Sequence, residues 1–211
     1  MGAIYRGLYA VTPDIPDTDD LLRRVEDALR GGTRLVQYRN KQAGTALRRE
    51  QAAFLVTLCH EHTARLIVND DLALALEIGA DGVHLGREDG GLAAARTALG
   101  PQNILGVSCY NDMERVREAR RQGADYVAIG SVFPSSTKPG AIPAPLNLLA
   151  QAKAACGLPV CAIGGITLQN APKLIAAGAD LLAVVSDLFE APDIQSRAAA
   201  FTQLFPEQTT P

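Results

Sequence analysis

The sequence predicts an α/β fold in one domain, 1–211: a closed (β/α)8 barrel of the TIM-barrel type. Three observations predict it. Eight short apolar runs alternate with longer amphipathic stretches, the apolar runs are hydrophobic on both faces, and one three-residue phrase recurs before several runs. Apolar strands separated by helices are typical of a parallel sheet that helices cover. Eight such units favour a closed barrel, and an open doubly wound sheet is the main alternative.

The predicted strands are short runs rich in Val, Ile and Leu, which is typical of buried strands. They span residues 7–12, 34–39, 65–70, 82–86, 103–108, 126–133, 159–165 and 181–186. The clearest predicted helices span residues 18–32, 45–62, 113–123 and 168–178. The first shows both end signals, because Thr18, Asp19 and Asp20 suit a helix start and the Gly31-Gly32 pair suits a helix end.

The recurring phrase is Gly-Ala-Asp, found at residues 79–81, 123–125 and 178–180, each time just before a predicted strand. Glycine takes the left-handed conformation that helix ends often need. The phrase therefore predicts a repeated unit in which a helix ends, a short turn follows and a buried strand begins.

Composition excludes several classes of function. Apolar residues make up 47% of the chain and charged residues 20%, with a net charge of -3. A general nucleic-acid binder needs a basic surface, so none is expected. No apolar run reaches the length of a membrane span, and the first residues lack the pattern of a secretory signal, so we expect a cytoplasmic protein without membrane contact. We expect small-molecule substrates and a monomer or small homo-oligomer.

The cysteines and histidines give no motif for covalent or zinc chemistry. The cysteines, Cys59, Cys109, Cys156 and Cys161, form no CxxC pair and are predicted to be reduced and buried. The histidines, His60, His62 and His84, are predicted to have structural roles. No HExxH, Walker or GxGxxG sequence is present.

Polar residues follow the predicted strands, at the end of a barrel where active sites lie. Gln37, Arg39 and Lys41 alternate in sequence, so an extended chain places them on one face. Such cations suit phosphate oxygens, although a polar layer inside the barrel is the simpler alternative. Carboxylates follow the next two strands, Asp70 after Asn69 and then Asp89. Carboxylate oxygens with phosphate oxygens are typical of a Mg²⁺ site, although a helix N-cap also explains the first of these carboxylates.

A second set of polar residues predicts another anion site. Residues 134–145 read "PSSTKPGAIPAP" and are interpreted as an active-site loop that holds Ser135, Thr137 and Lys138. Gly164-Gly165 and Val185-Ser186 follow the last two strands, where these barrels commonly bind phosphate. Two anion sites predict two phosphorylated substrates, with diphosphate as a leaving group.

These motifs together resemble the thiamine-phosphate synthase (thiamine-phosphate pyrophosphorylase) family over nearly the whole chain. The stretches that carry the resemblance are "LYAVTPD", "VQYRNK", "LIVNDD", "GADGVHLGRED", "GADYVAIGSVFPSSTKP", "VCAIGGIT" and "GADLLAVVSDLF". The resemblance implies a Mg²⁺-dependent condensation of hydroxymethylpyrimidine diphosphate with hydroxyethylthiazole phosphate. The products are thiamine phosphate and pyrophosphate, and the diphosphate leaves before the thiazole attacks.

The resemblance also implies the roles of the site residues. The pyrimidine diphosphate would be bound by Gln37, Arg39, Lys41, Asn69, Ser108 and Lys138. The Mg²⁺ would be held by Asp70 and Asp89. The thiazole phosphate would be bound by Ser135, Thr137, Gly165, Val185 and Ser186. Catalysis would rest on Ser108, Arg39 and Lys138.

Two other functions stay open at this point: a thiazole tautomerase-like paralogue and a non-catalytic protein that binds thiazole or thiamine phosphate. A tautomerase of this kind uses a histidine after the fifth strand. Here Cys109 and Tyr110 follow Ser108, which counts against that activity. Asn40 and Ser135 also depart from the family's usual residues, and Asn40 is expected to point away from Gln37 and Arg39.

Overall fold

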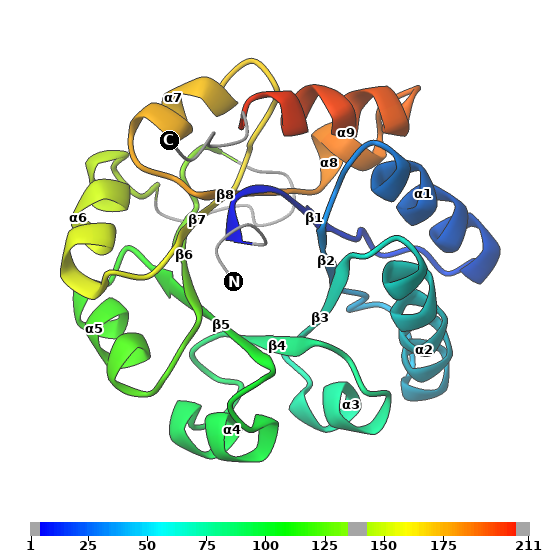
Figure 1. Ribbon diagram of the computed structural model, residues 1–211, viewed down its shortest axis with the longest axis horizontal. Helices are drawn as coiled ribbons and strands as arrows, with labels where there is room; N and C mark the ends of the chain where they lie inside the picture. The colour runs from blue at the N-terminus through cyan, green and yellow to red at the C-terminus, as the bar shows by residue number, and fades with distance from the viewer. Residues whose placement is uncertain (1–4, 135–142, 206–211) are drawn as a thin grey trace.

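The computed structural model describes residues 5–134 and 143–205. Eight parallel strands close into a barrel in chain order, and helices surround it (Figure 1). The strands are β1 Gly7–Val11, β2 Leu35–Tyr38, β3 Arg65–Asn69, β4 Gly82–Leu85, β5 Ile104–Tyr110, β6 Tyr126–Gly130, β7 Val160–Ile163 and β8 Leu181–Val184. The pairing of β1 with β8 closes the sheet, which confirms the predicted barrel and rules out the open sheet.

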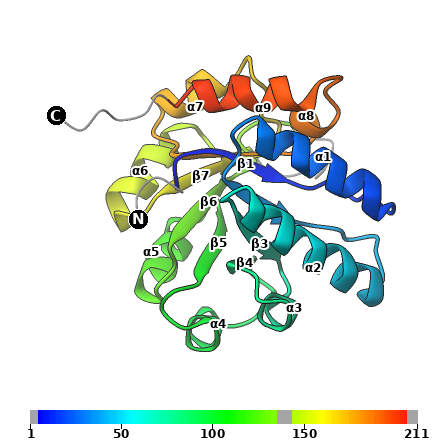
Figure 2. The ribbon, with the colours of Figure 1, turned by 45° about the vertical axis from the view of Figure 1, so that its right-hand side comes forward.

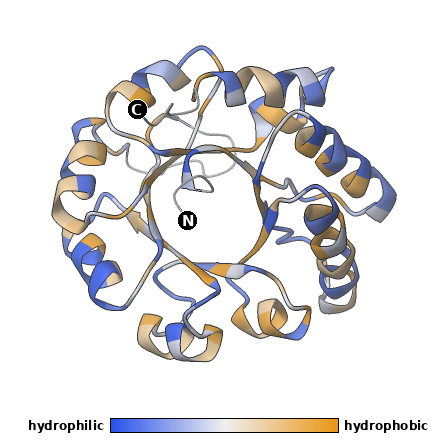
Figure 3. Cartoon of the chain, in the orientation of Figure 1, coloured by the Kyte–Doolittle hydropathy of each residue, from blue (hydrophilic) through white to orange (hydrophobic). Residues whose placement is uncertain are grey.

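Helices follow the strands and form the outer ring (Figures 1 and 2). They are α1 Thr18–Arg30, α2 Thr45–Glu61, α3 Leu72–Glu77, α4 Leu92–Leu99, α5 Met113–Arg121, α6 Asn147–Cys156, α7 Ala171–Ala176, α8 Ser186–Phe189 and α9 Ile194–Gln203. Figure 3 shows hydrophobic colouring along the ring of strands and both colours on the helices. The helices therefore bury one face against the sheet.

The buried residues form two clusters, one on each side of the sheet. The larger lies between strands and helices and includes all the buried leucines of α1 and α2. The smaller fills the barrel interior and consists of Tyr9, Val11, Leu35, Ile67, Ile104, Tyr126, Ala128, Cys161, Leu181 and Ala183. Burying each large apolar side chain contributes about 1.5–3 kcal/mol. All four cysteines are free and buried, as expected.

All eight strands end one to three residues from their predicted ends: β1 to β4 end one residue early and β8 ends two residues early. β5 continues past Ser108 to Tyr110, because a register shift against β6 lets the strand extend. β6 ends at Gly130 rather than at residue 133. β7 ends before Gly164, because this glycine and the next have φ angles of 108° and 58°, which an extended strand does not accommodate.

Each aspartate of the Gly-Ala-Asp phrase makes two hydrogen bonds with one residue of the preceding strand. Asp81 N–H donates to Leu66 O at 3.0 Å, and its carboxylate accepts from Leu66 N–H at 2.8 Å. Asp125 does the same with Leu105, and Asp180 with Val160. We call Asp81, Asp125 and Asp180 the aspartate clamps.

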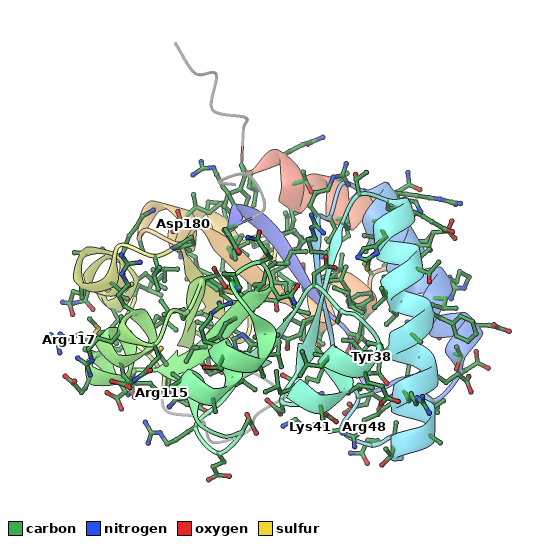
Figure 4. All side chains as sticks on the ribbon, turned by 60° about the horizontal axis from the view of Figure 1, so that its bottom comes forward. Tyr38, Lys41, Arg48, Arg115, Arg117 and Asp180 are labelled. Carbon is green, nitrogen blue, oxygen red and sulfur yellow. The ribbon has the colours of Figure 1, made fainter. Side chains whose placement is uncertain are left out.

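The aspartate clamps lie at the N-terminal end of the barrel, where they join β3 to β4, β5 to β6 and β7 to β8. Figure 4 shows Asp180 toward the opposite end of the barrel from Lys41, which follows β2. Each clamp carboxylate also pairs with a cation, namely Arg65, Arg96 or Lys153. The recurring phrase is therefore a stabilising device, remote from the strand ends that carry the candidate site.

We predict that Asp180→Ala lowers the free energy of unfolding by about 2 kcal/mol, because it leaves the buried Val160 N–H without its acceptor. Lys153→Ala is the matched control. It removes only the half-exposed cation 2.6 Å from Asp180 and should cost less than about 1 kcal/mol. Urea unfolding of both variants checks this, and equal losses would contradict the backbone role of the carboxylate.

Candidate active site

A pocket of about 1080 Å³ opens at the C-terminal ends of the strands. Every described candidate residue lines it, namely Gln37, Arg39, Lys41, Asn69, Asp70, Asp89, Ser108, Gly165, Val185 and Ser186. The other candidates, Ser135, Thr137 and Lys138, lie outside the described residues. Residues predicted from six different strand ends thus meet at one cavity, which is where barrels of this kind bind their ligands.

The end of β2 is held in place by residues that follow β1. Thr12 Oγ1 donates to Arg39 O at 2.9 Å and accepts from Arg39 N–H at 2.8 Å. Asp14 Oδ1 lies 3.2 Å from Arg39 Nη1 and accepts from Lys41 N–H at 2.6 Å. Sequence reasoning missed Thr12 and Asp14, although their place just after an apolar strand was an available signal.

Tyr38 and Asn40 point to the outer side of β2, as the alternation predicts. Tyr38 Oη donates to Gln51 Oε1 at 2.9 Å, and Asn40 Nδ2 donates to Ile15 O at 2.9 Å and to the same Gln51 oxygen at 3.1 Å. These bonds tie β2 to α2, and Figure 4 shows Tyr38 beside that helix. Both side chains therefore have structural roles.

Two carboxylates lie together at the ends of β3 and β4. Asp70 has a φ of 63°, and its Oδ2 lies 3.0 Å from Lys41 Nζ. Asp89 Oδ2 accepts from Gly86 N–H at 2.6 Å. The two carboxyl groups lie close enough to change each other's pKa. Asp71, the next residue, caps α3 by accepting from Leu74 N–H at 3.0 Å, so only this third residue of "NDD" is a helix cap.

The pKa values of the two carboxyl groups are shifted in opposite directions. Burial raises the pKa of Asp89, and the neighbouring Asp70 carboxylate raises it further. Burial also acts to raise the pKa of Asp70, but hydrogen bonds from Asp89 and Lys41 and the charge of Lys41 outweigh it, so this pKa lies below its ordinary value. Asp89 therefore holds a proton more tightly than Asp70 does.

This pair fits a divalent cation. A cation between the carboxylates would offset their mutual repulsion and favour the ionised form of both. Among the described residues, no group of three or more His, Cys, Asp or Glu side chains could hold a metal ion. Two carboxylates without further protein ligands suit Mg²⁺, which usually takes its other ligands from water and substrate phosphates.

Ser108 lies on β5 and hydrogen-bonds to His84 of β4, with 2.8 Å between Oγ and Nε2. His84 also lines the pocket. Sequence analysis predicted only a structural role for this histidine, and its signal was weak because a single histidine in a strand usually is structural. The structure brings it to within hydrogen-bond reach of a candidate catalytic residue.

Arg115 is a second residue that sequence reasoning missed. It lies on α5, where an arginine in an amphipathic helix gives no functional signal. Its Nε donates to Ser108 O at 2.6 Å, and its Nη2 donates to Gly86 O at 2.6 Å. Arg115 therefore holds together the ends of β4 and β5, and Figure 4 shows it on the inner side of its helix compared with Arg117.

The other side of the pocket is formed by the ends of β7 and β8. A side chain at Gly164 would lie 2.1 Å from Ser131 Oγ, and one at Gly165 would lie 2.2 Å from Pro134 O. Only glycines fit there, and Asn170 Nδ2 fixes the turn by donating to Gly165 O at 2.9 Å. α8 begins at Ser186, so its first residue lines the pocket. The two glycines carry no side chain, so their main chain borders the pocket.

Comparison with known proteins decides the family. Residues 8–188 match the family model described as thiamine monophosphate synthase. The chain belongs to the thiamine monophosphate synthase family. It is 58% identical over 200 residues to the thiamine-phosphate synthase of Aromatoleum aromaticum, covering 95% of this chain and 96% of the relative. It is 56% identical to that of an Azoarcus species, covering 97% of this chain and 100% of the relative.

Solved structures agree with the family. A thiamine phosphate pyrophosphorylase from Pyrococcus furiosus superposes with a TM-score of 0.83 and 34% identity over 95% of both chains. A 3-hexulose-6-phosphate synthase superposes with a TM-score of 0.71 and 20% identity, over 94% of this chain and 99% of that one, which shows the shared barrel alone. This chain, as a thiamine-phosphate synthase family member, is an enzyme of the transferase class that acts on small molecules. Among the described residues, no helix is long and apolar enough to cross a membrane.

We predict that Asp89→Asn raises the thermal midpoint at pH 7. Because folding raises the pKa of Asp89, its ionisation destabilises the folded state. This loss of stability is absent below the ordinary pKa of Asp and grows as the pH rises toward the raised pKa of Asp89.

Calorimetric scans without divalent cations check this prediction. The gain should shrink as the pH is lowered toward the ordinary pKa of Asp, about 4. Asp19→Asn is the control, because it removes an exposed carboxylate from the first turn of α1. A gain that is independent of pH would contradict the raised pKa of Asp89.

Proposed function

We propose that the enzyme condenses hydroxymethylpyrimidine diphosphate with hydroxyethylthiazole phosphate, in a Mg²⁺-dependent reaction that yields thiamine phosphate and pyrophosphate. The observation that carries the proposal is the pocket's composition. On one wall, cations flank the carboxylate pair at the ends of β2, β3 and β4, and on the other wall lies a glycine turn with exposed main chain. This arrangement suits a metal-bound diphosphate facing a second phosphorylated molecule.

The diphosphate end of the pyrimidine substrate fits the cationic wall. Arg39 offers a planar guanidinium whose side chain is only 15% exposed, and Lys41 offers a point charge beside Asp70. Asn69 lies beside them at the end of β3, and we assign Lys138 to the same diphosphate. Asp14 already orients Arg39, so little side-chain freedom is lost when the anion binds.

Asp70 and Asp89 would hold the Mg²⁺. When bound, the cation would neutralise charge that develops on the departing diphosphate. Lys41 contacts Asp70 and would stay close to the same phosphate oxygens.

The reaction needs charge stabilisation rather than proton transfer. The bond between the pyrimidine methylene carbon and the diphosphate oxygen breaks, and its electron pair leaves with pyrophosphate. The thiazole nitrogen then gives its lone pair to the methylene cation, which forms the new carbon–nitrogen bond. Arg39 and Lys138 would stabilise the leaving group, and Ser108 would bind the pyrimidine ring beside the reacting carbon. Gln37 would contact the same ring.

The thiazole phosphate fits the opposite wall. Gly165 and the start of α8 at Val185 and Ser186 would bind its phosphate, together with Ser135 and Thr137. Close approach to main-chain amides is available there because side chains are absent or small. With the two phosphates on opposite walls, the thiazole nitrogen and the pyrimidine methylene carbon would face each other across the pocket.

Neither alternative function, the thiazole tautomerase or the non-catalytic binding protein, is favoured by the structure. Cys109 stands where a tautomerase would carry its histidine, but its thiol is buried and contacts Val107 O at 3.7 Å. Burial raises the pKa of this thiol to about 12, so it is a poor acid-base group. A non-catalytic binding protein would leave the carboxylate pair unexplained. Cytoplasmic location and a monomeric or small homo-oligomeric state stay predictions.

We predict that purified protein releases pyrophosphate and forms thiamine phosphate from the two substrates with Mg²⁺, and that chelation lowers the rate at least about 100-fold. Asp89→Asn should lower kcat by a similar factor while leaving the protein folded. Coupled pyrophosphate release and chromatography of the product check both. Asp19→Asn serves as the control for the loss of one carboxylate. Product formation that is indifferent to both Mg²⁺ and Asp89 would contradict the metal assignment, and absence of product would contradict the proposed function.

A further inference from the structure

A chain of hydrogen bonds crosses the barrel interior and connects two walls of the pocket. Gln37 Nε2 donates to Tyr9 Oη at 2.8 Å, and Tyr9 Oη lies 2.8 Å from Tyr126 Oη. Tyr126 Oη lies 2.8 Å from His84 Nδ1, and His84 Nε2 lies 2.8 Å from Ser108 Oγ. Gln37 and Ser108 line the pocket, whereas Tyr9 and Tyr126 are fully buried in the interior cluster.

Because Gln37 Nε2 can only donate, it determines which atom donates and which accepts in each later hydrogen bond of the chain. Tyr9 accepts from Gln37, and among the described residues Tyr126 is its one hydrogen-bond acceptor. If Tyr126 donated to Tyr9 instead, the Tyr9 proton would be buried without an acceptor, which is costly. Tyr9 therefore donates to Tyr126, and Tyr126 donates to His84 Nδ1.

The donor and acceptor roles of His84 determine the role of Ser108. A neutral imidazole that accepts at Nδ1 carries its proton at Nε2, so His84 donates to Ser108 Oγ. Burial raises the pKa of Tyr9 and of Tyr126 well above the ordinary value, so both phenols keep the protons that the chain requires. The hydroxyl proton of Ser108 is then directed away from His84, toward the pocket that Ser108 lines.

The two ends of the chain thus present different groups to a ligand. Gln37 uses one of its two amide N–H groups within the chain, which sets the orientation of the amide, and the amide oxygen is the acceptor that Gln37 can offer to a ligand. Ser108 accepts from His84, which leaves its hydroxyl as a donor. The pocket consequently offers an acceptor from β2 and a donor from β5, and a ring with a donor and an acceptor complements them.

We propose that Tyr9, Tyr126 and His84 are positioning residues that fix Gln37 as an acceptor and Ser108 as a donor, and so select an aminopyrimidine over an oxopyrimidine. The inference rests on the proposed function, because the pyrimidine of thiamine carries an exocyclic amino group beside an acceptor nitrogen. An oxo analogue reverses this pattern, since it carries an exocyclic acceptor beside a ring N–H. The interior phenols determine a specificity although they do not contact the substrate.

Binding measurements test the inference without turnover. Calorimetry with Mg²⁺ and without thiazole phosphate gives the dissociation constants of the 4-amino pyrimidine diphosphate and its 4-oxo analogue. Wild-type protein should prefer the amino compound by at least about 100-fold, because an unmatched buried polar group is costly. Tyr126→Phe removes one oxygen and keeps the ring. It should lower this ratio about tenfold, because His84 and Ser108 can then adopt either polarity.

Matched variants separate polarity from general packing. Tyr9→Phe breaks the chain one link earlier and should also lower the ratio. Tyr5→Phe is the control, because its ring lies 6.2 Å from that of Tyr126 and its hydroxyl takes no part in the chain. Thermal midpoints show which variants are folded. An unchanged ratio in folded Tyr126→Phe or Tyr9→Phe protein, or an equal loss of affinity for both compounds, would overturn the inference.

The proposed function can fail separately from the inference. If wild-type protein forms no thiamine phosphate, the proposed function fails, and the binding ratio still tests the chain. If wild-type protein forms the product but binds both pyrimidines equally, the proposed function stands and the inference is overturned.

Discussion

Closure of the sheet is the constraint on which the rest of the structure depends. Because β8 pairs with β1, the side chains that point inward from eight strands share one enclosed interior. Most of that interior is apolar, but Tyr9 and Tyr126 place hydroxyl groups in it. Water does not reach them, so their hydrogen bonds must come from other inward residues. Gln37 and His84 supply those bonds, and both also face the pocket.

The barrel separates its stabilising groups from its ligand-binding groups. At the N-terminal end, each aspartate clamp is fully engaged by main-chain amides and a cation. At the C-terminal end, burial and the neighbouring Asp70 carboxylate raise the pKa of Asp89. Ionised Asp89 thus opposes folding, whereas the ionised aspartate clamps support it, because the clamp carboxylates have matched partners before any ligand binds.

The sequence predicted the fold and most of the described site for physical reasons that can be stated. Periodicity and strand count predict a closed barrel, and closure brings the residues after each strand to one end. Residues such as Arg39 and Asp89 were accessible to this reasoning because they lie within four residues after the end of a strand. Arg115 was not accessible, because its role depends on where α5 packs. The periodicity of a helix does not predict that its arginine donates to Gly86 O and Ser108 O. The direction of the interior hydrogen-bond chain was equally inaccessible, since it depends on contacts between residues as far apart in sequence as Tyr9 and Tyr126.

The aspartate clamps also bear on the order in which the barrel folds. Each joins residues only 15 or 20 positions apart in sequence, so β3 with β4, β5 with β6 and β7 with β8 can form at a small loop-closure entropy. The equivalent position before β2 is Arg34, whose side chain cannot accept a hydrogen bond. The pair of β1 and β2 therefore lacks the hydrogen bond that an aspartate clamp supplies. β1 must also find β8 across most of the chain. We therefore expect three strand-pair modules to form early and the seam on both sides of β1 to close last, so the N-terminal strand completes the barrel.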